Sequence, residues 1–60
     1  MDSTTTLFNR IEAVGGHLKI EHATAEKGDK AAKARARRYA AEMGKLLRQY
    51  RKASMSEKAE

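Results

Sequence analysis

The sequence contains no cysteine, and this absence excludes disulfide bonds and thiolate zinc sites together. Its two histidines, His17 and His22, are separated by five positions. That spacing places them about 140° apart around a helix, whereas a shared metal ion favours pairs at i,i+3 or i,i+4. We therefore expect two solvent-facing histidines, no metal site and no cofactor.

Proline is also absent, and no apolar run approaches the ~20 residues that a membrane span requires. No secretory signal peptide is visible at the N-terminus. The composition is rich in alanine, lysine, arginine and glutamate, which favour helix. These features predict an all-α, cytoplasmic protein, most naturally a bacterial one, with no membrane partner.

The chain has only 60 residues, which allows one small domain. A chain of this length buries about 60% of the surface that it exposes when unfolded, so a lone monomer is marginally stable. Small domains usually add disulfides, a metal or a partner chain. Because the first two are excluded, self-association is the remaining source of stability.

A first helix is predicted over about residues 4–27. Asp2 and Ser3 can each cap its start. Gly15-Gly16 interrupts it at about 1 kcal/mol per glycine, but the apolar phase continues unchanged, which favours one continuous helix. Its main apolar residues recur at spacings of four, three and four, and so form one stripe: Leu7, Ile11, Val14 and Leu18.

The segment Lys27-Gly28-Asp29 predicts a hinge between two helices. Gly28 suits the left-handed position after a helix, and the carboxylate of Asp29 is a good N-cap for the next one. A connection this short makes the helices antiparallel neighbours. We therefore expect a coiled-coil-like two-helix hairpin in a single domain over 1–60, with the second helix at about 30–57.

The second helix has the clearer heptad pattern. Its core positions follow spacings of 4, 3, 4, 3, 4 and 3: Ala32, Ala36, Tyr39, Met43, Leu46, Tyr50 and Ala53. Ala40 and Leu47 lie beside these positions and widen the apolar face to that of a bundle helix. Since one hairpin leaves much of this face uncovered, we predict a homodimer, as a four-helix bundle or an elongated antiparallel assembly.

Positive charge is concentrated in the second half of the chain. Residues 1–29 have three basic and five acidic side chains, a net charge of −2, whereas residues 30–60 have ten and three, a net charge of +7. Lys30 begins a surface opposite the core positions, and Lys33 and Arg35 lie on its flanks. Six further basic residues continue it for about 30 Å: Arg37, Arg38, Lys45, Arg48, Arg51 and Lys52.

Solvated helical faces generally mix charges, because like charges at i,i+4 oppose the helix. The like-on-like stacking here indicates that phosphates supply the counter-charge, and it predicts sequence-independent binding of double-stranded DNA. Two alternatives stay open: a helical interaction module that docks an acidic protein, and RNA binding. No enzyme motif or framed carboxylate pair is present, so we expect neither catalysis nor a small-molecule substrate.

Two segments also resemble a known family. Ala25-Glu26-Lys27-Gly28-Asp29-Lys30-Ala31-Ala32 leads to Arg35 and Arg37-Arg38, and Tyr50-Arg51-Lys52-Ala53-Ser54 follows later. Over roughly residues 18–58, these motifs resemble the bacterial linker-histone-like nucleoid proteins first named in chlamydiae. The resemblance implies a nucleoid-associated protein that binds DNA, compacts the chromosome and self-associates through its helical part. Without the long Lys/Ala/Pro-rich tail of the chlamydial members, this sequence resembles the short, tail-less members.

Overall fold

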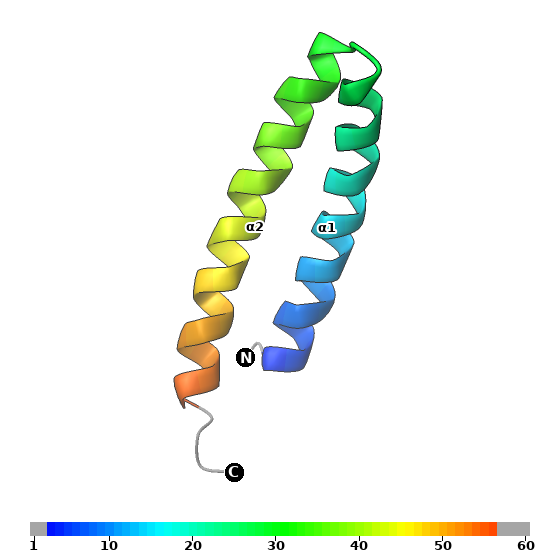
Figure 1. Cartoon of the computed structure of the whole chain (residues 1–60). Helices are drawn as coiled ribbons and strands as arrows, with labels where there is room; N and C mark the ends of the chain where they lie inside the picture. The colour runs from blue at the N-terminus through cyan, green and yellow to red at the C-terminus, as the bar shows by residue number, and fades with distance from the viewer. Residues whose placement is uncertain (1–2, 57–60) are drawn as a thin grey trace.

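The computed structural model describes residues 3–56, which form two helices joined by a tight hinge. Helix α1 is Thr4–Glu26 and helix α2 is Lys30–Ser56. They run antiparallel and side by side, so that the start of α1 and the end of α2 lie at the end opposite the hinge (Figure 1). The predicted all-α, two-helix architecture is confirmed, and the expected last helical residue, at position 57, lies outside the described residues.

Ser3 caps the start of α1. Its hydroxyl accepts a hydrogen bond from the Thr6 amide at 3.2 Å, and its carbonyl accepts one from the Leu7 amide at 3.0 Å. These bonds satisfy amide groups that have no partner within the helix. Helix α1 then continues through Gly15-Gly16 without a break.

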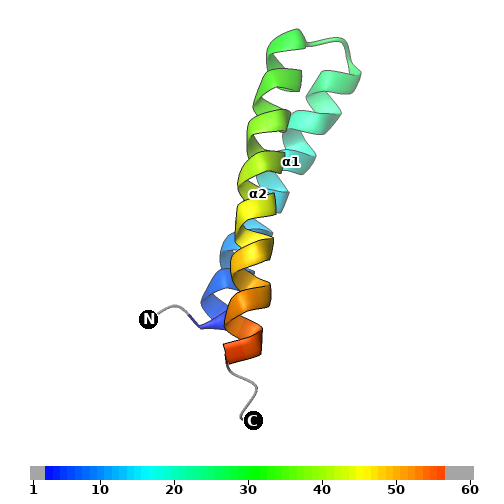
Figure 2. The ribbon, with the colours of Figure 1, turned by 90° about the vertical axis from the view of Figure 1, so that its left-hand side faces the viewer.

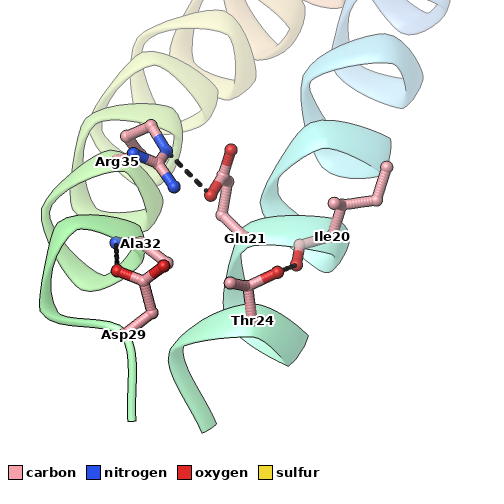
Figure 3. A network of polar contacts seen from close by, with 6 residues as sticks. All are labelled: Ile20, Glu21, Thr24, Asp29, Ala32 and Arg35. Atoms are coloured by element: carbon pink, nitrogen blue, oxygen red, sulfur yellow. Dashed lines mark hydrogen bonds and ion pairs between the residues drawn. The ribbon is translucent and has the colours of Figure 1, made fainter. Parts of the chain in front are cut away.

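The hinge uses a single glycine in the left-handed region. Gly28 has φ +104°, a conformation that costs other residues roughly 1–2 kcal/mol. Its amide donates to the Ala25 carbonyl at 2.9 Å, which ends α1. The Asp29 carboxylate then accepts a hydrogen bond from the Ala32 amide at 3.1 Å and caps α2 (Figure 3). The chain therefore reverses within three residues.

The core lies between the two helices. Leu7, Ile11 and Leu46 are buried together, and four partly buried side chains pack against them: Val14, Met43, Tyr50 and Ala53. Ala25 and Ala32 are buried near the hinge, where small side chains allow a close approach of the helices. The hairpin is slender, with extents of 48 × 15 × 14 Å. Figure 2 shows α2 in front, with α1 crossing behind it from one side near the hinge to the other side near the termini.

The predicted core positions differ in depth. Leu18, Ala36 and Tyr39 are half-buried, whereas Leu47 is 47% exposed and lies outside the core of the hairpin. Leu47 lies beside the line of core positions rather than on it, so that α1 alone does not cover it.

One flank of the hairpin, called here the polar flank, is closed by contacts between the helices. The Arg35 side chain donates to the Glu21 carboxylate at 2.9 Å (Figure 3), and the His17 ring stacks on Tyr39 with centroids 5.2 Å apart. The Glu21 side chain is only 19% exposed. A carboxylate so placed is stabilised by the guanidinium opposite.

Candidate nucleic-acid interface

The surface of α2 that faces away from α1 is the candidate site, and it is called here the basic face. Eight of the nine predicted DNA-binding residues form it, and all eight are exposed: Lys30, Lys33, Arg37, Arg38, Lys45, Arg48, Arg51 and Lys52. At 1.5 Å per residue, the distance from Lys30 to Lys52 along the helix is about 33 Å. The face therefore extends along nearly the whole of α2.

The buried side of α2 fixes the direction of the basic face. Ala32 and Leu46 are buried against α1, and Met43 and Tyr50 pack against the core. Since these residues share one side of the helix, the lysines and arginines at the opposite heptad positions lie on the other side. Folding therefore converts a charged sequence into an ordered surface.

Within the described part of the chain, no acidic residue lies on the basic face. The only carboxylate of α2 belongs to Glu42, which lines a shallow hollow with Arg35, Arg38 and Tyr39 on the polar flank. On the basic face itself, Arg48 and Lys52 are one helical turn apart. Like charges at this spacing oppose helix formation by roughly 0.2–0.5 kcal/mol per pair. Glu42 also shares a hollow with Arg38 and Lys45, so it borders the face at one edge, and the rest of the face has only positive charge in the described chain.

Arg35, the ninth predicted residue, lies apart from the others. Its guanidinium is directed at α1, where it pairs with Glu21 (Figure 3). A side chain already engaged in an intramolecular ion pair has less charge to offer a phosphate. Arg35 therefore belongs to the polar flank and not to the basic face.

Met55 was not predicted and belongs to this surface. It is 63% exposed and shares an open hollow of about 510 Å³ with Lys45, Arg48, Gln49, Arg51 and Lys52. The spacings of four and three from Arg48 through Lys52 to Met55 could have revealed this placement. The end of the basic face thus combines basic side chains with an apolar one.

Neither histidine is arranged for metal binding. His22 Nε2 lies 3.6 Å from a Glu26 carboxylate oxygen, and His17 stacks on Tyr39. Among residues 3–56, no three side chains of the histidine, cysteine and acidic types come together as metal ligands. In the described chain, neither helix contains an apolar stretch long enough to cross a membrane.

Comparison with known proteins identifies the family of the chain. The model of the family described as histone H1-like protein Hc1 matches residues 5–60. No curated protein and no solved structure matches. The family match confirms the resemblance seen over residues 18–58, and it also includes residues 5–17, for which the motifs gave no indication. A histone-like, DNA-binding role in general follows from this match, and the chain belongs to the Hc1 family of histone H1-like proteins.

Proposed function

We propose that this protein binds double-stranded DNA in the bacterial nucleoid without sequence preference, and that the basic face of α2 makes the contacts. One observation supports this most strongly: eight exposed basic side chains share one face of about 33 Å, with no acidic residue among them. Binding of this kind neutralises phosphates and releases counterions. Its biological role is the organisation or compaction of the chromosome.

Small residues on the same face favour contact with the DNA backbone. Ala34 and Ala41 are exposed between the basic side chains, and a Cβ atom built on Gly44 meets nothing within 4 Å. These positions allow the helix to approach a duplex while the long side chains reach phosphates on either side. Alanine and glycine offer no side-chain hydrogen bonds to base edges, which is consistent with sequence-independent binding.

The acting unit in this proposal is a homodimer. Within residues 3–56, the buried hydrophobic residues of one hairpin are few, and two of them are alanines: Leu7, Ile11, Ala25, Ala32 and Leu46. So small a core is marginal for a chain of this length. Association with a second copy would enlarge it.

Reversal of charge on the basic face tests the DNA-binding proposal. Exchange of Arg37, Arg38 and Arg48 for glutamate should abolish the shift of duplex DNA in a gel-shift assay, because attraction to phosphates becomes repulsion. The matched control reverses three basic residues of the α1 half, Arg10, Lys19 and Lys27, and so makes the same change in net charge. The control should retain most of the affinity. Circular dichroism should show unchanged helicity in both variants.

Equal loss of affinity in the two variants would contradict the placement of the site on α2, and unchanged affinity in both would contradict DNA binding by this face. Competition between duplex DNA and RNA at matched salt distinguishes the two polymers. If RNA competes better, the proposed polymer is wrong. A partner protein that survives nuclease treatment in a pull-down would instead favour docking of an acidic protein.

A further inference from the structure

The flank of the hairpin opposite the polar flank is apolar and uncovered. Phe8 and Leu47 are 49% and 47% exposed on it. Nearer the hinge, Met43 lies over Gly15, so closely that a Cβ atom on Gly15 would come within 3.1 Å of the Met43 ε-methyl carbon. We call this surface the open flank and define it by Phe8, Gly15, Ala36, Ala40, Met43 and Leu47.

Heptad spacing places these residues on one side of the hairpin. Phe8 and Gly15 lie on one line of α1 that continues to His22, seven residues apart at each step. Ala40 and Leu47 lie on one line of α2 that begins at Lys33. His22 and Lys33 line the same hollow near the hinge, together with Ala36. The two lines therefore run along the same flank.

The two flanks differ in what closes them. The polar flank has the ion pair between Arg35 and Glu21 and the ring stack of His17 on Tyr39. No hydrogen bond or ion pair joins the defining residues of the open flank across the helices. Two large apolar side chains are half-exposed at one level of a slender hairpin with a small core, so covering them would add apolar burial that one hairpin lacks.

We propose that a second copy of this chain covers the open flank, and that two hairpins pack flank to flank as a four-helix bundle. The open flank of one copy is the surface that a second copy presents, so the contact is self-complementary. Burial of Phe8 and Leu47 supplies the apolar contact that the core of one hairpin lacks.

Charge at the edges of the open flank favours one orientation. The α1 edge has Glu12 and Glu26 around Lys19, whereas the α2 edge is basic, with Lys30, Lys33, Arg37 and Arg51. If α2 lay over the α2 of the other copy, the basic edges would oppose each other. If α1 lies over α2, Glu26 of one copy is level with Lys33 of the other. The second arrangement opposes like charges only where Lys19 meets Arg37, so it is electrostatically the more favourable one, and its two-fold axis runs parallel to the helices.

This orientation has a consequence for DNA, which rests on the proposed function. In this arrangement α1 of each copy lies over α2 of the other copy. The two α2 helices therefore occupy diagonal corners of the bundle. Their basic faces then point to opposite sides. A dimer built this way holds two duplexes at once, so its action on DNA is bridging.

Cysteine cross-linking tests the interface, since the chain has no cysteine of its own. In the proposed bundle, Phe8 of one copy lies against Leu47 of the other. A mixture of the F8C and L47C variants should therefore form disulfide-linked dimers several-fold faster than either variant alone. The control I20C, at an apolar position that is 64% exposed on the outer side of α1, should cross-link slowly. Equal rates in all samples would overturn the proposed interface.

The exchange F8Q/L47Q tests the same surface in solution. The native chain should have twice its 6.7 kDa mass by analytical ultracentrifugation, and the variant should have the mass of one chain. The native protein should retain a second, labelled duplex on DNA-coated beads, whereas the variant should bind one duplex without bridging. A native monomer would overturn the inference while leaving DNA binding intact. A cross-linked dimer that binds no DNA would instead contradict the proposed function. If the variant loses its helical signal, the cross-linking rates decide.

Discussion

At the residue scale, the adjacent glycines of α1 have different surroundings. Gly15 faces α2, and a Cβ atom there would lie 3.1 Å from the Met43 ε-methyl carbon. Gly16 faces outward, with nothing within 4 Å of a Cβ atom. Both glycines weaken the helix relative to alanine. Only at Gly15 is this loss of helix stability offset, because the missing side chain leaves room for Met43 between the helices.

This difference predicts opposite results for two alanine variants. Gly16→Ala should stabilise the hairpin by about 0.5–1 kcal/mol, because it removes backbone entropy from the unfolded chain. Gly15→Ala should gain less or lose stability, because the Met43 methyl group must move. Thermal unfolding followed by circular dichroism at one protein concentration measures both changes. A larger gain from Gly15→Ala than from Gly16→Ala would contradict the packing described for Met43.

The paired contacts of the polar flank could have been predicted from the sequence. Residues that are equally distant from Gly28 along the chain lie opposite each other, as with Glu21 and Arg35, and with His17 and Tyr39. Heptad phase placed Arg35 correctly on a flank. Heptad phase alone could not show that Glu21 faces Arg35, because the register of the two helices is set by the hinge at Gly28 and not by the phase of either helix.

At the element scale, the placement of α2 depends on its first turn. The Asp29 carboxylate accepts the Ala32 amide at 3.1 Å, and the Asp29 carbonyl accepts the Lys33 amide at 3.3 Å. Ala32 is fully buried directly after this cap. The cap therefore sets where α2 begins, and with it the direction of the basic face.

Exchange of Asp29 separates capping from charge. Asp29→Ala should destabilise the protein by about 1 kcal/mol, whereas Asp29→Asn should cost little, because asparagine caps nearly as well without a charge. Urea unfolding of the two variants provides the comparison. Equal destabilisation would indicate that the charge of Asp29, rather than its hydrogen bond, stabilises this turn.

The sequence patterns predicted the two helices and the buried side of α2 better than the exposure of the residues beside that buried side. The heptad spacing of α2 identified Leu46 and Tyr50 as core positions, because one periodic stripe determines which side faces α1. It grouped Leu47 with them, although α1 is too narrow to cover it. The heptad spacing of α2 also places Met55 on the basic face, but the predicted surface was defined by its basic residues alone and so did not include Met55. Periodicity gives direction around a helix, but burial also depends on the width of the neighbouring element.

At the scale of the whole molecule, the hairpin has three surfaces with different chemistry. The polar flank is closed by its own contacts, the open flank is apolar, and the basic face lies opposite α1. We infer that the open flank serves assembly and the basic face serves DNA. The two surfaces share an edge at Lys33 and Arg51, and the rest of the basic face stays open when the open flank is covered, so both uses are available at once.

The central claim is that DNA phosphates contact the basic face of α2, and a salt titration of duplex binding tests it most directly. Lys45→Gln/Lys52→Gln removes two charges from that face, and Lys19→Gln/Lys27→Gln removes two from the α1 half. The slope of log affinity against log salt falls by about 0.9 for each lost phosphate contact. We predict a slope lowered by about two in the first variant and little changed in the second. Equal slopes in the two variants would contradict the claim.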